Sequence, residues 1–397
     1  MAHIPDAPLT CLDVWCKGGS YYEEEGEEGL AHFLEHMIFK GSRKLKAVEF
    51  DKKIEALGGS SNAATGLDDV HYYVLIPPKE LTKAIDLLLN IVLNPSLQKE
   101  QYSLERAVVL EEMAQYQDQP EEQIFQALLE NCWPGHPYGR SILGFEQSLI
   151  SSKPEDMNFF HLRRYQPENI SLSIAGFIPK NIQLLLQNSD LSKLKKFTPK
   201  ETTAKQVLSF RLGRKEIEVP RLESARILMA WSLPPAKDQL MIMGADLATT
   251  LLAEGRTSRL VNHLRENLKI VESIEMEITS LEQGGLIILE ACCLVDNLET
   301  VEKEINQILK ELLRNRPPIK EVEKAKQMVR NSLCYSLELP SQIAGINASQ
   351  ALWGRHQSLL QPLEHLKYWE SCNLQQEIFK VLQPENNFTL IAKPKKF

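Results

Sequence analysis

The spacing of apolar residues along the first 120 positions predicts a mixed series of strands and helices. Residues 9–15, 61–64 and 70–76 are short segments in which β-branched, aromatic or small residues predict strands. Apolar residues at helical spacing predict helices over residues 30–39, 47–57, 80–93 and 100–117. Glycine pairs at 18–19 and 58–59 and the proline pair at 77–78 separate these elements.

A similar order of elements returns in the second half of the chain. An apolar run at 286–294 predicts a strand, and residues 298–313 and 320–333 predict helices on either side of a proline break. The two series start 216 residues apart (286 − 70 = 216) and share few letters, which indicates a weak internal duplication. We therefore expect an α+β protein with two related domains, at 1–190 and 216–397, joined by a polar linker at 191–215.

Composition narrows the class of protein without naming a chemistry. The chain has 397 residues, enough for two or three domains, and a net charge of −8 that argues against nucleic acid as a partner. No run of 18 apolar residues predicts a membrane span, and the first 20 residues do not resemble a signal peptide. The 7 cysteines are odd in number and irregularly spaced, so we expect buried thiols, a reducing compartment and a cytoplasmic location.

The strongest chemical signal is the segment 32–36, which reads His-Phe-Leu-Glu-His. On a helix His32 and His36 share one face and can reach one metal ion, with Glu35 close enough to contact a water on that metal. The alternative is a surface helix with two unrelated histidines. Catalytic zinc needs three protein ligands and an open position, and the helix at 100–117 offers Glu105, Glu111 and Glu112 as candidates for the third.

At this point the sequence resembles a known family, the inverzincin peptidases, which include pitrilysin, insulin-degrading enzyme and the mitochondrial processing peptidase. Its members have a His-x-x-Glu-His helix, a zinc-binding glutamate about 75 residues later, and another important glutamate seven residues before that one. Here 112 − 36 = 76 and 112 − 105 = 7, so Glu112 matches the ligand and Glu105 the companion. Further segments are similar to family landmarks, at 29–31, 37–41, 58–65, 136–139, 144 and 165–169.

The resemblance implies a zinc endopeptidase with one Zn²⁺ per chain, held by His32, His36 and Glu112. Glu35 would be the general base. Glu105 would orient a ligand, the alternative being a salt bridge to a neighbour such as Arg106. Asn62 and Ala63 match the edge strand that pairs with the backbone of an extended peptide substrate; the alternative is an ordinary strand.

For the second half, the resemblance implies an arginine and a tyrosine seven residues apart that hold substrate and stabilise the oxyanion. Arg265 fits the arginine, unless it is a plain surface residue, but position 272 is Glu272, which cannot act as an oxyanion donor. Family members of this length have two domains, each a mainly antiparallel sheet packed by helices, and form half of a clamshell. We therefore expect a homodimer or heterodimer with a related subunit. A catalytically silent scaffold subunit of the same fold is the alternative function.

Two further features have open interpretations. The acidic loop at 23–28 and the cluster Asp118, Glu121 and Glu122 flank the site residues in sequence, and would favour basic peptides if they line the chamber. A solvated loop is the alternative, and the one we favour. His71 lies between Val70 and Tyr72 and is interpreted as a strand histidine rather than a ligand.

Overall fold

The computed structural model describes residues 1–197 and 206–395, which form two compact units. Both units are discontinuous in sequence. The first contains Met1–Gln115, Arg140–Lys205 and Tyr335–Leu359, and the second contains Tyr116–Gly139, Gln206–Cys334 and Leu360–Phe397. The sequence pattern predicts contiguous domains at 1–190 and 216–397, whereas each unit contains one segment from the other half of the chain. Residues 198–205 of the expected linker at 191–215 lie outside the described residues.

The first unit is built on a five-stranded sheet in the order β1-β5-β2-β4-β3. Its strands are β1 (Ala2–His3), β2 (Thr10–Cys16), β3 (Ser60–Thr65), β4 (Val70–Ile76) and β5 (Ile170–Gly176). All neighbouring strands are antiparallel except β1 and β5. The β4 side chains alternate between buried and half-buried, as expected for a strand that has helices on one face.

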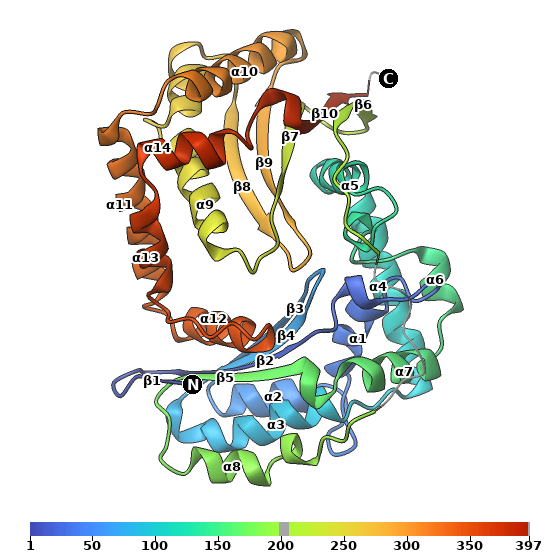
Figure 1. The fold of residues 1–397 in the computed structure, drawn as a ribbon. Coiled ribbons are helices and arrows are strands. Elements are labelled where there is room, and N and C mark those ends of the chain that lie inside the picture. The colour runs from blue at the N-terminus through green and yellow to red at the C-terminus, as the bar shows by residue number, and fades with distance from the viewer. Residues whose placement is uncertain (198–205, 396–397) are drawn as a thin grey trace. The chain divides into compact units, whose positions relative to one another are not determined.

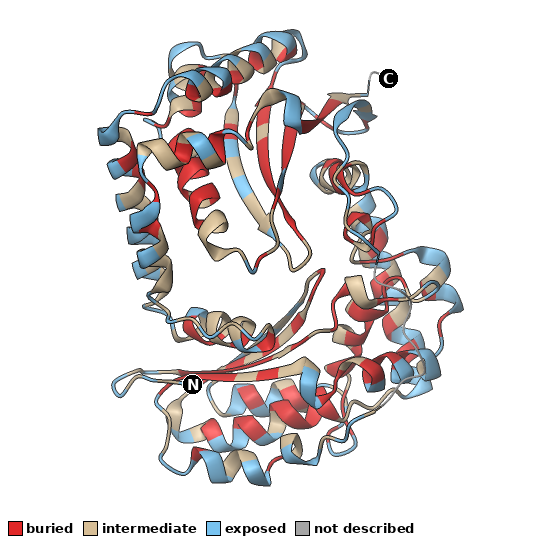
Figure 2. Cartoon of the chain, viewed as in Figure 1, coloured by how far each residue is buried: buried red, intermediate tan, exposed pale blue. Residues whose placement is uncertain are grey.

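Helices cover this first sheet on both faces (Figure 1). The helix α3 (Leu81–Leu93) packs against β2 and β4 on one face. The helices α1 (Leu30–Ile38) and α2 (Glu49–Ala56) contact β3, and α12 (Pro340–Leu352) packs on β2 and β5. Figure 2 shows buried positions concentrated on the strands and along α3. The helices are α1 (Leu30–Ile38), α2 (Glu49–Ala56), α3 (Leu81–Leu93), α4 (Lys99–Gln117), α6 (Glu146–Ser151), α7 (Pro154–Arg164), α8 (Ile182–Asn188) and α12 (Pro340–Leu352).

The second unit repeats this plan with a five-stranded sheet in the order β6-β10-β7-β9-β8. Its strands are β6 (Gly213–Val219), β7 (Ala225–Leu233), β8 (Ser273–Ser280), β9 (Gly285–Cys293) and β10 (Asn387–Pro394). A core that includes Trp231, Trp369 and Phe379 lies between the sheet and its helices. The helices are α5 (Pro120–Cys132), α9 (Gln239–Ala253), a π-helical turn at Val261–Asn267, α10 (Leu298–Arg314), α11 (Ile319–Ser336), α13 (Gln361–Tyr368), α14 (Ser371–Asn373) and a second π-helical turn at Leu374–Phe379.

The two sheets have the same topology, which confirms two related α+β domains with mainly antiparallel sheets. Each has a parallel pair at one edge, β1 with β5 and β6 with β10. At the other edge, β3 occupies the same position in the first sheet as β8 does in the second. The internal duplication is therefore visible in strand order although few residues match.

Two expectations from composition can be compared with the described residues. None of the described helices is both long and apolar enough to cross a membrane. The cysteines are all free: Cys11, Cys16, Cys132, Cys292 and Cys293 are buried, Cys372 is half-buried and Cys334 is exposed.

Candidate active site

The helix that carries the candidate metal ligands has an unusual N-terminus. Gly29 precedes α1 in the left-handed region with φ of 95°. Because glycine has no side chain, it cannot cap the helix. The side-chain carboxyl group of Glu23 takes that role, because its Oε1 atom accepts backbone N–H bonds from Gly29 at 3.1 Å and Ala31 at 2.8 Å. Burial raises the pKa of Glu23 to about 8, although the two backbone hydrogen bonds act in the opposite direction and lower it. The first turn of α1, and with it His32, is thereby fixed.

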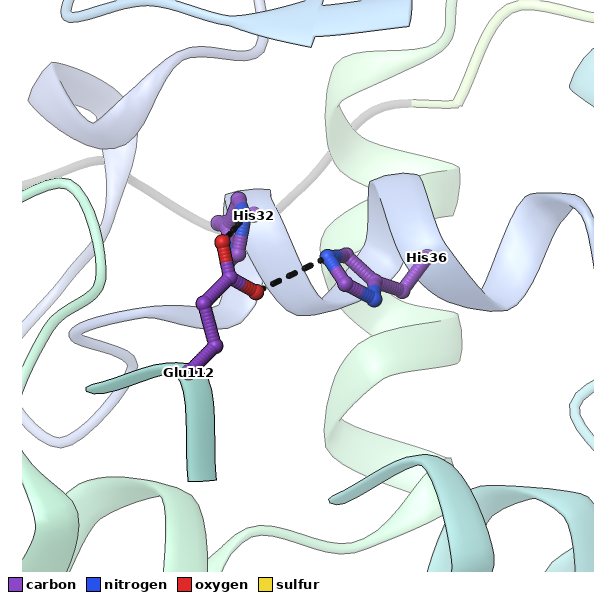
Figure 3. Close-up of side chains that lie close together, drawn as sticks. All are labelled: His32, His36 and Glu112. Carbon is purple, nitrogen blue, oxygen red and sulfur yellow. Dashed lines mark ion pairs between the residues drawn. The ribbon is translucent and has the colours of Figure 1, made fainter. Parts of the chain in front are cut away.

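Three side chains converge beside α1. The Nε2 atom of His32 lies 3.7 Å from Glu112 Oε1, and the Nε2 atom of His36 lies 3.4 Å from Glu112 Oε2 (Figure 3). One candidate ligand atom from each residue lies within 4.8 Å of the other two, and no other group of this kind occurs among the described residues. Glu112 is on α4, so the site joins two helices that are far apart in sequence. Its side chain is 44% exposed, which leaves one side of the cluster accessible to solvent.

Glu105 lies two helical turns before Glu112 on α4 and contacts Nδ1 of His36, the ring nitrogen that does not face Glu112. Its Oε1 is 2.9 Å from His36 Nδ1, and its Oε2 is 2.8 Å from Lys40 Nζ. A carboxylate at Nδ1 fixes the tautomer that presents Nε2 to a metal. Arg106 does not pair with Glu105; its guanidinium donates to the backbone oxygens of Ile150 and Ser152.

Glu35 projects from α1 toward the first sheet. Its carboxylate accepts a 2.5 Å hydrogen bond from the Thr65 hydroxyl at the end of β3. Burial raises the pKa of Glu35 above its ordinary value, partly offset by Thr65 and by the histidines His36 and His71. Burial and the neighbouring His36 lower the pKa of His32 to about 4, so this ring is neutral near pH 7, the form that binds metals.

Asn62 and Ala63 lie on β3, at the open edge of the first sheet. The Ala63 N–H is bonded to the side-chain oxygen of Asn62 at 2.9 Å. This contact covers one donor of an edge that is otherwise ready to pair with another strand.

The acidic loop is solvated only in part, because Glu25 is exposed but most of its other carboxyl groups are buried or paired, so the favoured interpretation was wrong for most of it. Glu23 and Glu28 are buried. Glu24 and Glu27 pair with the buried guanidinium of Arg163, at 3.0 and 2.5 Å. Glu28 accepts from the Gly26 N–H, from Ser148 and from Arg140. Buried carboxylates persist because each has a donor, and this loop holds α1 to α7. In the separate cluster, Asp118 pairs with Arg221 and Glu121 with Arg226.

Arg265 and Glu272 both belong to the second unit. Arg265 lies on a π-helical turn, and its guanidinium donates to its neighbour Glu266 at 2.8 and 3.0 Å. Glu272 accepts from the Ser224 hydroxyl at 2.9 Å and from the Cys292 thiol at 3.3 Å. The Glu272 carboxylate is therefore held within its own unit.

Sequence reasoning missed three residues that support the site. Thr65 was noted only as part of a similar segment, Lys40 was not singled out, and Glu23 was interpreted as part of a solvated loop. A cap from outside the helix leaves no spacing signal, because Glu23 is six residues from the first N–H that it accepts.

The donor set fits zinc. Two imidazoles and one carboxylate form a common set of protein ligands for catalytic Zn²⁺, and the carboxylate behind His36 is a frequent supporting contact. The Nδ1 atom of His32 is buried and has no partner among the described residues, so the support of the two rings is unequal.

The fold and this cluster define a class: a two-domain α+β protein with an inverted His-x-x-Glu-His motif and a glutamate from a second helix. The family model described as insulinase, peptidase family M16, matches residues 1–146, and the model described as the peptidase M16 inactive domain matches residues 152–329. The chain therefore belongs to peptidase family M16.

Relatives and solved structures agree with this assignment. The chain is 25% identical over 360 residues to an uncharacterized zinc protease of Rickettsia bellii, covering 89% of this chain and 85% of that protein. It is 27% identical to one of Mycobacterium tuberculosis strain H37Rv, covering 92% and 84%. A protease structure from Helicobacter pylori matches 99% of this chain and 95% of its own at a TM-score of 0.90 and 23% identity, which shows the fold.

Proposed function

We propose that the chain is a zinc-dependent endopeptidase that hydrolyses peptides or short unfolded segments. The observation that supports this most directly is the convergence of His32, His36 and Glu112 on one point, next to a helix turn that carries Glu35. Membership of a peptidase family, and relatives that are named zinc proteases, support the same conclusion.

His32, His36 and Glu112 would hold one Zn²⁺. When bound, zinc supplies Lewis acidity, which activates a water molecule and polarises a peptide carbonyl. Glu35 would accept a proton from the attacking water and later pass it to the leaving amine. Its buried position keeps its carboxylate more basic than an exposed glutamate, and Thr65 fixes the orientation of that carboxylate. Glu105 would hold His36 in the required tautomer.

The edge strand β3 would bind the substrate backbone. Pairing through main-chain hydrogen bonds orders an extended peptide without reading most of its side chains. The Asn62 side chain would have to leave the Ala63 N–H as the peptide pairs there. Because pairing with β3 needs an extended backbone, it favours flexible segments over folded ones.

Glu35→Gln tests the mechanism with a quenched fluorescent peptide. The variant should lose about a hundredfold to ten-thousandfold in kcat while retaining zinc. Glu111→Gln is a matched control, since Glu111 is an exposed neighbour of Glu112 on α4. Full activity in Glu35→Gln, or zinc content unchanged in His36→Ala, would contradict the proposal.

The second candidate is a catalytically silent subunit that works with a partner. It is motivated by Glu272, which stands where the resemblance places a tyrosine and which is bonded to Ser224 and Cys292. We propose that the active form is a dimer with a related subunit that supplies the missing oxyanion donor. A monomeric mass in solution together with full peptidase activity would contradict the dimer. Zinc binding without turnover, alone or with a related subunit, would favour the silent role.

A further inference from the structure

The face of the first sheet on which α12 packs carries a group of aromatic side chains between that helix and the edge strand. His71 of β4 lies between the rings of Trp15 and Tyr73, with centroid distances of 4.6 Å and 5.8 Å. His71 and Tyr73 are nearly parallel, at 18°. We call these three residues the ring shelf. Trp15 and His71 are direct partners in the β2–β4 pairing, so the backbone register fixes the shelf.

The shelf has a buried carboxylate behind it. Asp13 Oδ1 lies 3.2 Å from His71 Nδ1, and the Asp13 side chain is only 3% exposed. Among the described residues, His71 is the only residue with a side chain paired to this carboxylate. In the neutral ring, Nδ1–H donates to Asp13 and Nε2 remains as an acceptor. In that form the Asp13 carboxylate lies behind the aromatic rings with the His71 N–H as its side-chain donor.

The edge strand leaves a path to this shelf. Asn62 and Ala64 of β3 point to the same face, opposite Tyr73 and His71, and both are exposed. The helix α12 packs mainly on β2 and β5, where a Cβ on its Gly345 would lie 3.7 Å from Asp13 Oδ2 and 3.8 Å from Trp15, whereas β3 forms the edge of the sheet beyond that contact. Ala64 is the residue between the sheet edge and His71. Its methyl group is too short to block a side chain that crosses it.

A peptide paired with β3 would place alternate side chains on this face. Strands are about 4.8 Å apart, so such a side chain starts about 10 Å from His71 and must be long to reach it. The His71 side chain is 24% exposed, so part of its ring is accessible from solvent.

We propose that the ring shelf, with Asp13 behind it, is a subsite for an arginine of the extended peptide. Arginine is long enough, its planar guanidinium stacks on aromatic rings, and it donates to an acceptor such as Nε2. A leucine could cover the rings but could neither donate nor offset the charge of Asp13. This inference rests on the proposed function, because it assumes a peptide on β3.

An arginine scan tests the subsite by binding rather than by cleavage. A fluorescent nine-residue peptide of neutral sequence carries one arginine, moved a position at a time, and its affinity for the full-length Glu35→Gln chain is measured by anisotropy. Affinity should rise about fivefold to tenfold at positions that face the shelf and not at those between them. The period of two separates the subsite from the general attraction of a basic peptide to an acidic protein.

Variants then locate the subsite on the shelf. Ala64→Leu should abolish the arginine preference by closing the path, whereas the matched control Ala64→Ser should retain it. Asp13→Asn should reduce the arginine preference. His71→Gln should reduce it as well, and this variant leaves the buried carboxylate unchanged. Circular dichroism verifies that each variant is folded.

The outcomes separate this inference from the proposed function. Arginine preference in binding, with no cleavage by the unaltered chain, would support the subsite and refute the peptidase. Cleavage with no position-dependent arginine preference, or a preference unchanged in both Ala64→Leu and His71→Gln, would overturn the subsite alone. If no peptide of the scan binds, the subsite is overturned.

Discussion

The orientation of the His36 imidazole ring depends on Glu105, seven residues before the candidate ligand Glu112. Glu105 contacts His36 Nδ1 and Lys40, and it is buried while Glu112 is half-exposed. The two glutamates are spaced two helical turns apart on α4, so one helix supplies both a candidate ligand and its support.

We expect Glu105→Gln to lower zinc affinity about tenfold to a hundredfold, because the amide is a weaker acceptor for the His36 N–H. Competition with a fluorescent chelator measures the affinity. Glu111→Gln on the same helix should leave it unchanged. An equal loss in both variants would show that helix stability, and not the contact with His36, determines the affinity.

A buried histidine away from the site should make stability depend on pH. Burial lowers the pKa of His161 to about 4, and its Nε2 lies 2.9 Å from the Val92 carbonyl oxygen. The unfolded chain takes up this proton near pH 6.5 and the folded chain does not, so the stabilising contribution is complete above pH 6.5 and is lost as the pH falls towards 4.

Between pH 7 and pH 5 this one group should cost about 2 kcal/mol of unfolding free energy. Denaturant unfolding of the unaltered chain and of His161→Gln at both pH values gives the difference. The variant should have the smaller pH dependence. Identical pH dependence in the two proteins would exclude His161 as its source.

At the residue scale, sequence spacing predicted the candidate metal ligands and missed the supporting residues that tertiary packing places beside them. His32, His36 and Glu112 follow a helical period or a family spacing, and their candidate atoms do lie together. Glu23, Lys40 and Thr65 act on the same helix from positions set by tertiary packing. Nothing in their neighbouring residues marks them.

At the scale of elements, the stability of α1 depends on a residue outside the helix. The Glu23 carboxylate satisfies two N–H groups of the first turn, which no residue of the helix could do.

Glu23→Ala should therefore destabilise the protein by about 1–2 kcal/mol, and it should also weaken zinc binding because His32 is the next residue after Ala31. Thermal unfolding and chelator competition measure the two effects. Glu25→Ala is the control, since Glu25 is exposed in the same loop. A Glu23→Ala protein with unchanged stability would contradict the capping role.

Two glycines in left-handed conformations separate two effects of adding a side chain: backbone strain, which both positions have, and a steric clash, which only one has. Gly144 has φ of 75°, and a Cβ there would meet the backbone of Glu28 and Gly29 at 2.2 Å. Gly26 has φ of 89°, and a Cβ there would meet nothing within 4 Å.

Gly26→Ala should cost only about 1 kcal/mol, the price of the left-handed conformation, whereas Gly144→Ala should cost several times more. It would also displace the start of α1, because Gly144 contacts the residue before that helix. Denaturant unfolding compares the two variants. Equal losses would mean that the loop at 144 moves away freely.

The strongly periodic elements were predicted within a few residues. Residues 30–39, 70–76 and 80–93 correspond to α1, β4 and α3. The sequence pattern does not predict β1, a strand of two residues, or the place of α5 in the second unit. Short strands are stabilised by their neighbours in the sheet, so their own residues carry little signal.

At the scale of the whole molecule, a metal ion at the candidate site would contact the first unit alone. His32, His36 and Glu112 all lie in the segment Met1–Gln115. Zinc at a hundred times its dissociation constant should stabilise the folded state by about 2.7 kcal/mol.

Hydrogen exchange with and without a chelator should show this gain mainly in the first unit, in α1 and α4. The strands β7 and β9 of the second unit serve as the internal reference. Equal changes in both units would show that they unfold as one cooperative block, and would contradict a local effect.

The exchange of segments between units could not be predicted from local pattern. Residues 335–359 follow a helix of the second unit without a break in polarity, and α11 ends only at Ser336. What assigns α12 to the first unit is its contact with Cys11 and Ala175 through Ile343 and Ala344. Such long-range contacts have no period along the chain.

The return of α12 to the first sheet has a consequence during biosynthesis. A ribosome releases the five strands of that sheet long before it has synthesised residues 340–352. Until then, the face of β2 and β5 that includes Cys11, Trp15 and Ala175 has no cover, and the nascent chain resembles a truncated fragment. Such exposed strands are prone to aggregate, so folding of the N-terminal half on the ribosome should depend on chaperones. A fragment that ends near residue 190 should be insoluble for the same reason, even though it contains every candidate zinc ligand.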